Sequence, residues 1–332
     1  MPATEAQAHP VRALNAAALG DVLVAMLDLV RANEDELNRL NVFPVRDHDT
    51  GTNMALTLEG VVKAVEATRG RPMAELAGGV VDAAMLAARG NSGTILAEAL
   101  HGLFETWAQL DVVGPADLVR GFRAAADRAE QSVLEPVEGT ILTVARVTAD
   151  AMEAAAPAGL GDLLAGAVEA AAGAVEATTG QLPALRRAGV VDAAARGFEL
   201  CVRAFAETMA REAGSPPAAA EVEVERPETP PTREPATGGE ASQRATPGPG
   251  GDGDAGPAFE VQYLLAASEE DVRELRRSLT TIGDSITVAC GDGRYRVHVH
   301  TDDAGAAIEE AIRRGPVSRI EVAYLGNGAR SE

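Results

Sequence analysis

Cysteine is scarce in this chain of 332 residues, which has only Cys201 and Cys290, isolated from each other in the sequence. That usage indicates neither a disulfide framework nor a multi-cysteine metal site, and it fits a reducing cytoplasm. No stretch is apolar over the length of a bilayer, and residues 1–6 do not combine a basic region with a following apolar run. We therefore expect a soluble, cytoplasmic protein without membrane insertion.

Aromatic residues and lysine are also rare. Aromatics make up 3% of the chain against 46% hydrophobic residues in all, so the core must consist of Ala, Leu and Val, which suit closely packed helices. Lys63 is the one lysine, and 50 acidic residues against 29 basic ones give a formal net charge of −21. This charge argues against binding to nucleic acid and to anionic membrane surfaces.

Apolar residues recur at helical spacing through the first two thirds of the chain. Glycine and proline divide this pattern into about eight helices, with no convincing strand among them. The sequence therefore predicts an all-α bundle in which Ala and Gly pairs permit close contacts. The predicted helices cover residues 11–40, as one helix or two, and 55–67, 73–88, 94–109, 115–132, 140–156, 160–179 and 191–211.

The composition changes abruptly at 216–257, which holds nine of the chain's 18 prolines and almost no large apolar side chain. Such a segment cannot bury enough surface to offset the entropy lost on ordering. We therefore predict a multidomain chain with a helical domain over 1–213 and a disordered linker over 214–257, in which the alternating Glu221–Glu225 is solvated. A small α/β domain follows over 258–326.

Strand and helix patterns alternate over the short final part of the chain. This mixture predicts a sheet that helices cover on one face. Gly291–Gly293 is typical of a hairpin turn between two strands. The predicted strands are 259–265, 285–290, 295–300 and 317–325, and the predicted helices are 268–279 and 304–314.

Two carboxylates, Asp47 and Asp49, stand one residue apart and are followed by Thr50 and Gly51. On a turn, these residues present hard oxygen ligands, which suit Mg²⁺ together with nucleotide phosphates. The same residue types also make ordinary turns and start helices, so that alternative stays open.

A second loop of this kind is Ala88–Thr94, which lies between two predicted helices. Gly90 and Gly93 allow backbone N–H groups to approach a phosphate at a helix N-terminus. Together the two loops suggest a nucleotide site. Thr140 and Asp192 each stand at the start of a predicted helix, where either residue caps the helix or approaches the nucleotide.

Blocks of characteristic residues follow one another along the chain in the order Asn41–Val45, Asp47–Met54, Ala88–Gly93, Pro136–Val144, Ala188–Asp192 with Gly197 and Phe198, and Val297–Asp302. Together they resemble the nucleotide-binding domain of fatty acid kinase A subunits, which is related to the DhaL domain of dihydroxyacetone kinases. The resemblance covers nearly the whole chain apart from its middle linker. It implies a barrel of helices with a nucleotide at one end.

The activity that the resemblance implies is that of an ATP- and Mg²⁺-dependent phosphotransferase component. Asp47 and Asp49 are then the catalytic pair that holds Mg²⁺ against the phosphates. The acceptor is the carboxylate of a fatty acid that a separate binding protein presents, and the product is an acyl phosphate. The oligomeric state stays open, a homodimer included. The residues placed at the nucleotide are Thr50, Asn53, Asn91, Ser92, Gly93, Thr140 and Asp192.

Two positions of the first loop depart from the family pattern, with Arg46 in place of Pro and His48 in place of Gly. His48 stands where glycine suits a positive φ, and we expect both side chains to weaken the Mg²⁺ dependence of nucleotide binding. Full-length family members continue into a further large domain, which we expect this chain to lack. These departures favour a second hypothesis, a non-catalytic nucleotide-binding module that regulates or scaffolds a partner. A third is a dihydroxyacetone kinase-like subunit.

His298 and His300 are two residues apart on a predicted strand and so share a face, where two imidazoles can bind one Zn²⁺. In the resembled family a cysteine on the first strand of this domain completes the site, whereas the alignment puts Glu260 there. We therefore expect packing to outweigh zinc binding at these histidines, with a weaker His-His-Glu site as the alternative.

Overall fold

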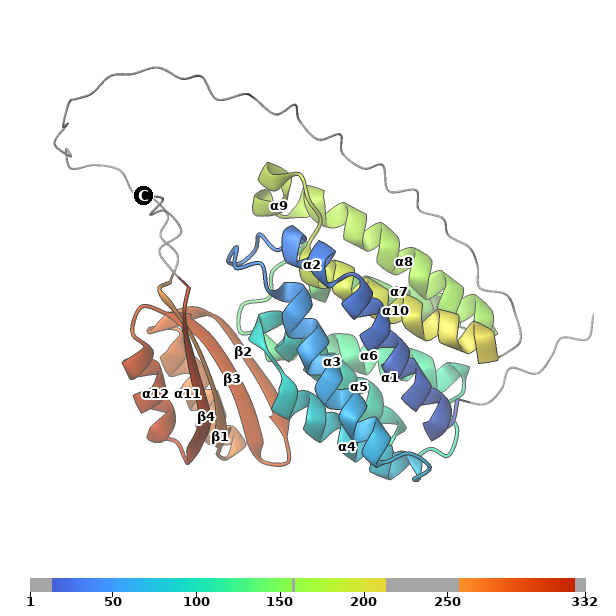
Figure 1. Cartoon of the computed structure of the whole chain (residues 1–332), viewed down its shortest axis with the longest axis horizontal. Helices are drawn as coiled ribbons and strands as arrows, with labels where there is room; N and C mark the ends of the chain where they lie inside the picture. Colours follow the sequence, from blue (N-terminus) through green and yellow to red (C-terminus); the bar gives the residue numbers. More distant parts are fainter. Residues whose placement is uncertain (1–13, 157–158, 213–256, 326–332) are drawn as a thin grey trace, which may run out of the picture.

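The computed structural model describes residues 14–156, 159–212 and 257–325, and it confirms the predicted fold class of a helical domain followed by a small α/β domain (Figure 1). The predicted linker lies outside the described residues except for Pro257, and so does Glu221–Glu225. Within the part of the chain that the structure describes, no helix is both long and apolar enough to cross a membrane.

Eight long helices of the helical domain form a closed ring, in which each helix packs on the next and the last packs on the first. The ring is the barrel that the resemblance implies. Two short helices, α2 (Glu34–Leu40) and α9 (Pro183–Ala188), complete the described helices of this domain. Around the ring the long helices are α1 (Ala16–Ala32), α3 (Thr50–Ala67), α4 (Met73–Ala87), α5 (Gly90–Trp107), α6 (Pro115–Ser132), α7 (Ile141–Ala155), α8 (Leu160–Gln181) and α10 (Ala193–Glu212).

Small residues at the helix contacts explain how a core with few aromatic side chains packs densely. A Cβ atom at Gly102 of α5 would lie 2.4 Å from the Ala124 carbonyl oxygen of α6. A Cβ atom at Gly60 of α3 would lie 2.3 Å from the Cβ atom of Ala87 at the end of α4. Because these positions have no side chain, the helix backbones approach closely, as the composition predicts.

Two helices begin earlier than predicted. Helix α3 begins at Thr50 instead of residue 55, and α5 begins at Gly90 instead of residue 94. Their first turns consist of Thr, Gly, Asn and Ser, whose low helix propensity hides the helix start from periodicity. The N–H groups of a first turn need no intrahelical partner, so these residues are tolerated there. The two polar loops of the sequence are therefore helix N-termini.

The α/β domain has the order βαββαβ, and its four strands are all antiparallel to their neighbours in the sheet order β2-β3-β1-β4. This is the ferredoxin-like arrangement. The predicted hairpin turn lies between β2 and β3, where Asp292 and Gly293 have φ values of 45° and 69°. The elements are β1 (Phe259–Ala266), α11 (Glu269–Leu279), β2 (Gly283–Gly291), β3 (Arg294–Thr301), α12 (Ala304–Ile312) and β4 (Val317–Tyr324).

The second face of this sheet is also covered over β2, β3 and Leu264 of β1, while most of β4 stays exposed, which corrects the prediction of a sheet covered on one face only. Helices α11 and α12 cover one face, while the other lies against α4 and α5 of the helical domain (Figure 1). Met85 of α4 packs there with Leu264 and Ala289. Because strand side chains alternate between faces, the polar residues of β1 and β3 point toward the helical domain. Sequence patterning could not show this, since the second cover comes from a distant part of the chain.

Candidate functional site

A cavity opens between the two domains, where the polar face of the sheet meets the first turns of several helices. It brings together most of the residues that the sequence singles out. Those lining it are Asp47, Asp49, Thr50, Asn53, Asn91, Ser92, Thr140 and Asp192 from the helical domain, and Glu260, His298 and His300 from the α/β domain.

Four helix N-termini reach this cavity, those of α3, α5, α7 and α10. Each carries the positive end of a helix dipole, so together they favour an anion. Thr140 caps α7 by accepting from the Leu142 N–H, and Asp192 accepts from the Ala195 N–H in α10. Helix α5 has no side-chain cap. Its first N–H groups, at Gly90, Asn91 and Ser92, are therefore the ones best suited to hold a phosphate.

Two asparagines shape the loop before α3, and sequence reasoning missed the first of them. Asn38 Oδ1 accepts from the N–H groups of Gly51 and Thr52, at 2.7 and 3.2 Å. Asn41 Oδ1 accepts from the N–H groups of Asp49 and Thr50, at 3.1 and 3.3 Å. These bonds cap α3, and the Asp49 side chain makes no capping bond. Asp49 is therefore the N-cap residue of α3 by position, but its side chain does not cap the helix.

The two aspartates of the loop share a buried place that is unfavourable for two negative charges. Burial, and next the neighbouring charge of Asp49, raise the pKa of Asp47 to about 7. Burial also raises the pKa of Asp49. Asp47 Oδ1 is buried and has no hydrogen-bond partner. A proton or a metal cation relieves such a pair, so this geometry fits the predicted metal ligands.

Arg46 and His48 point away from this pair. Both are exposed, neither lines the cavity, and His48 Nδ1 lies 3.1 Å from the Asn38 carbonyl oxygen. The φ of His48 is 58°, as expected at a position where the family has glycine. Asp47 and Asp49 line the cavity and their neighbours Arg46 and His48 do not, so the expected influence of these neighbours on the metal has no direct contact to act through.

The second polar loop, Ala88–Thr94, which we call the phosphate loop, also differs in detail from the prediction. Gly90 has a φ of 56°, and a Cβ atom there would lie 2.5 Å from Asn53 Nδ2, so the start of α5 requires glycine. Gly93 does not line the cavity, and its N–H donates to the Arg89 carbonyl inside α5. A Cβ atom at Gly93 would lie 2.4 Å from Thr57 Oγ1. Gly93 therefore serves the packing of α5 on α3, which corrects its predicted contact with phosphate.

Glu260, His298 and His300 face the aspartates from the sheet. Glu260 on β1 lies directly opposite His300 on β3, and the rings of His298 and His300 are 4.8 Å apart. His298 is 1% exposed, and neither of its ring nitrogens has a hydrogen-bond partner. Nδ1 of His300 also lacks one. Packing, the expected role of the two rings, does not explain why these buried nitrogens are unpaired.

Burial keeps both imidazoles neutral. Burial, and next the charge of Arg296, lower the pKa of His298 to about 3. Burial and the neighbouring His298 lower the pKa of His300 to about 4. A neutral imidazole with a free nitrogen lone pair is the form that ligates metal. The donor set of Glu260, His298 and His300 therefore fits a divalent cation, with an oxygen ligand in place of a thiolate.

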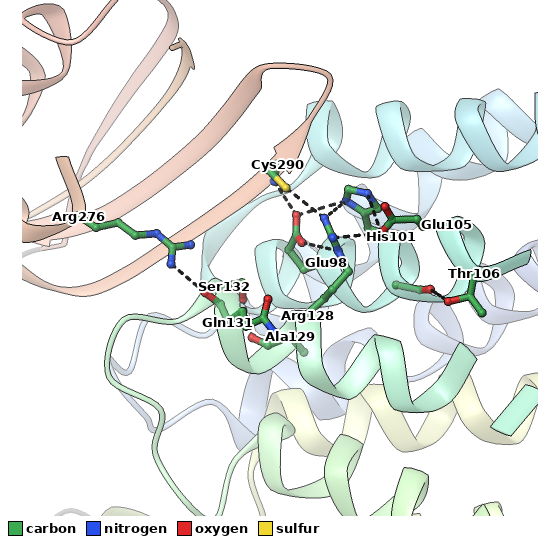
Figure 2. A network of polar contacts seen from close by, with 11 residues as sticks. Glu98, His101, Glu105, Thr106, Arg128, Ala129, Gln131, Ser132, Arg276 and Cys290 are labelled. Carbon is green, nitrogen blue, oxygen red and sulfur yellow. Dashed lines mark hydrogen bonds and ion pairs between the residues drawn. The ribbon is translucent and has the colours of Figure 1, made fainter. Parts of the chain in front are cut away.

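A second polar cluster joins the domains beside the cavity, and the sequence did not indicate it (Figure 2). Glu98 of α5 accepts from the Cys290 N–H of β2 at 2.6 Å and from Arg128 Nε of α6 at 3.1 Å. Nη2 of Arg128 donates to His101 Nδ1 and Cys290 Sγ, at 2.6 and 3.1 Å. Arg128 thus contacts a carboxylate, an imidazole and a thiol, and we call Glu98, His101, Arg128 and Cys290 the Arg128 cluster.

Further bonds hold the α/β domain in place. Thr287 Oγ1 donates to Asn91 Oδ1 at 3.1 Å, so a predicted phosphate residue also contacts the sheet. The Leu134 N–H donates to the Ile286 carbonyl at 3.1 Å, which attaches the segment before α7 to β2. Arg276 Nη1 donates to the Gln131 carbonyl at 2.9 Å (Figure 2). The cavity therefore has fixed walls on both sides.

The chain is similar to proteins of known sequence over most of its length. The chain is 28% identical over 292 residues to an uncharacterized protein of Staphylococcus saprophyticus, covering 87% of this chain and 51% of that protein. It is 26% identical over 321 residues to protein YloV of Bacillus subtilis, covering 94% and 56%. The chain thus spans about half the length of these relatives. A crystal structure of the dihydroxyacetone kinase from C. freundii in complex with AMP-PNP and Mg²⁺ matches with a TM-score of 0.46 and 18% identity, over 63% of this chain and 37% of that one.

Two protein-family models match the chain. The model of the DAK2 domain matches residues 44–207, which include both polar loops and the ring of helices from α3 to α10. The model of the FakA-like middle domain, named for the A subunit of fatty acid kinase, matches residues 256–331. These matches confirm the resemblance seen in the sequence. The chain therefore consists of a DAK2 domain followed by a FakA-like middle domain.

Proposed function

We propose that the chain is an ATP- and Mg²⁺-dependent phosphotransferase component that phosphorylates the carboxylate of a fatty acid held by a partner protein. The observation that carries this proposal is the uncapped N-terminus of α5 beside the Asp47–Asp49 pair in one cavity. A helix N-terminus attracts phosphate, whereas two carboxylates repel it. A divalent cation between the carboxylates and a phosphate removes this repulsion. Mg²⁺ with a nucleotide supplies both the cation and the phosphates.

Each wall of the cavity then has a role. Asp47 and Asp49 hold Mg²⁺, which when bound offsets the charge of the phosphates. The N–H groups of Gly90–Ser92 and the first turn of α7 at Thr140 hold the phosphate oxygens. Asp192 keeps its bond to α10 and fixes that helix start beside the nucleotide. Apolar lining residues such as Phe43, Val45, Val133, Val137 and Leu142 offer a surface for the adenine ring.

A carboxylate acceptor does not require a general base in the cavity. A fatty acid is already ionised at neutral pH, so its oxygen attacks the γ-phosphorus without losing a proton. One bond forms from that oxygen to phosphorus while the bond from phosphorus to the leaving oxygen of ADP breaks. Catalysis then rests on positioning and on neutralising phosphate charge. The match to the FakA-like middle domain supports this acceptor and a partner that presents it.

Calorimetric titration of the purified chain with ATP tests the first half of the proposal. We expect ATP affinity to fall at least tenfold when Mg²⁺ is removed and in Asp49→Asn. Asp35→Asn is the matched control, because it removes an exposed carboxylate of α2 outside the cavity. Equal affinity with and without Mg²⁺ would contradict the assigned metal role.

Transfer of labelled γ-phosphate to a fatty acid, in the presence of a fatty-acid-binding partner, tests the second half. An acyl phosphate that forms with the parent chain and not with Asp49→Asn supports the kinase. Tight Mg²⁺-dependent ATP binding without transfer would instead support the non-catalytic module. Transfer to dihydroxyacetone in place of the fatty acid would support the third hypothesis.

A further inference from the structure

Glu260 belongs to two groups of metal-binding side chains at once. Its carboxylate lies with those of Asp47 and Asp49 in a group whose ligand atoms are all within 4.8 Å of one another. It also lies with the imidazoles of His298 and His300 in a second group that meets the same limit. The first group spans the two domains, and Glu260 is the one member that the two groups share.

A carboxylate can serve both groups because it has two oxygens and four lone-pair positions. One oxygen can complete the all-oxygen set of the aspartates, which suits Mg²⁺ or Mn²⁺. The other can complete the set with the two imidazoles, which suits Mn²⁺ or Zn²⁺. Nε2 of Gln262 donates to Glu260 Oε1 and so orients the carboxylate.

Buried atoms without a hydrogen-bond partner lie on both sides of Glu260. His298 is 1% exposed and lines the cavity; neither of its ring nitrogens has a hydrogen-bond partner, and Nδ1 lies 3.6 Å from Glu260 Oε1. On the opposite side, Asp47 Oδ1 is buried without a partner. A buried polar atom left unpaired costs about 1–3 kcal/mol, so two such places beside one carboxylate call for ligands.

The protein itself does not supply a cation to these places among its described residues. No arginine or lysine lines the cavity. Arg296 on β3 does not line the cavity; its Nη2 donates to Gln262 Oε1 at 3.0 Å and lies 3.4 Å from Glu321 Oε1, while its Nε and Nη1 are buried without a partner. The Arg128 cluster shows the contrasting case, in which carboxylate, imidazole and thiol all contact an internal cation.

We propose that Glu260 bridges two divalent metal ions, one held by Asp47 and Asp49 and the other by His298 and His300. The bridge ties the metal site of the helical domain to the α/β domain, so loading of the site and docking of the domain are coupled. This inference rests on the proposed function only in sharing the Asp47–Asp49 ion, and it requires neither nucleotide nor turnover. Two-metal sites of this type act on phosphoryl groups from both sides of the transferred phosphorus.

The test uses Mn²⁺ alone, added to the full chain after treatment with EDTA. Calorimetry counts the ions bound, and low-temperature electron paramagnetic resonance reports whether two ions are magnetically coupled through a shared carboxylate. We expect two Mn²⁺ per chain with a coupled spectrum in the parent. Glu260→Gln should lose the coupling and lower the affinity for at least one ion by tenfold or more.

Two variants sharpen this result. His298→Gln should leave one uncoupled Mn²⁺ at the aspartates, whereas Glu270→Gln, an exposed change on α11 across the sheet, should leave both ions and their coupling intact. A single bound ion in the parent, or two ions that Glu260→Gln leaves unchanged, would overturn the bridge. If that happens while Mg²⁺-dependent ATP binding persists, the proposed function survives. If two coupled ions bind and ATP does not, the bridge stands and the proposed function fails.

Discussion

Two polar clusters lie at the same domain junction, built from similar residues but in opposite states of pairing. In the Arg128 cluster, Glu98, His101 and Cys290 surround a guanidinium that contacts all three. In the cavity, carboxylates and imidazoles meet without an arginine or lysine among the lining residues, and several of their atoms have no partner. The two clusters contain similar residue types that lie close together, and they differ in whether their polar atoms have partners within the protein.

The difference teaches how to tell a structural cluster from a ligand site. Where the protein supplies its own cation, the cluster stabilises the docking of α5 and α6 on β2. Where it does not, the cost of burying unpaired groups is offset only when a ligand arrives. The Arg128 cluster should therefore matter for stability and the cavity cluster for binding.

The largest expected effect comes from the same substitution at the two clusters. Glu98→Gln leaves the Arg128 charge without its buried partner, and it should lower the free energy of unfolding by about 3 kcal/mol. Glu260→Gln removes a charge that has no cation beside it, and it should change that free energy by less than about 1 kcal/mol. Urea unfolding of EDTA-treated protein measures both. Equal losses in the two variants would erase the distinction between the clusters.

Asp192 allows a second comparison, between a cavity carboxylate without a cation and an exposed one. Burial raises the pKa of Asp192 to about 6. Because the folded protein then holds a proton that the unfolded chain releases, Asp192 favours folding below its ordinary pKa near 4, and this stability is lost as pH rises through 6. Asp192→Asn keeps an oxygen for the Ala195 N–H and should gain about 2 kcal/mol over the parent between pH 4 and pH 6.

The control for this change is Asp303→Asn, which alters an exposed aspartate that caps α12 through the Ala306 N–H. Thermal unfolding across that pH range compares the three proteins. We expect a shallower pH dependence for Asp192→Asn alone. Parallel pH profiles for Asp192→Asn and the parent would show that the burial of Asp192 does not lower the free energy of unfolding as the pH rises.

A smaller effect is expected at the hydrogen bond that joins β2 to the phosphate loop. Thr287→Val removes the bond from β2 to Asn91 Oδ1 and should cost about 1 kcal/mol of stability. Thr281→Val is the control, because its hydroxyl bonds locally to the Ser278 carbonyl on the exposed surface. Chemical denaturation separates the two. A loss in Thr281→Val as large as in Thr287→Val would show that the domain junction is not involved.

The smallest effect concerns the exposed neighbours of the metal pair. Arg46→Pro with His48→Gly restores the family pattern, and the sequence alone predicts a steeper Mg²⁺ dependence of ATP binding. The outward placement of both side chains argues for a change of less than about threefold in that dependence. Mg²⁺ titrations of the double variant and the parent decide between these outcomes. A steeper curve in the variant would show that the two residues act on the loop without touching the cavity.

Much of the fold followed from local patterns. Helical periodicity and Gly or Pro punctuation predicted the eight long helices, and strand and helix patterns predicted the succession of elements along the α/β domain, because these signals are carried by neighbouring residues. The starts of α3 and α5 escaped prediction because their first turns are polar and contain glycine. The burial of the second sheet face escaped it because the cover comes from α4 and α5.

The residues of the candidate site were also predictable only in part. Asp47 and Asp49 were predicted from spacing and residue type, the resemblance added Asn91 and Ser92, and all four line the cavity. Asn38 as a cap, and the pairing of Glu98 with Arg128 and Cys290, depend on contacts between distant segments, which leave no local signal. The joint membership of Glu260 in two groups has the same origin.

Calorimetric unfolding with and without Mg²⁺ tests most directly the claim that the cavity, and not the Arg128 cluster, lacks a cation. At a Mg²⁺ concentration of about 100 times the Kd, binding to the folded state adds about 2.7 kcal/mol, which raises the Tm of the parent. Glu98→Gln should begin at a lower Tm and rise by the same amount, whereas Asp49→Asn should not rise. An equal rise in Asp49→Asn and the parent, or a rise that Glu98→Gln alone abolishes, would contradict this claim.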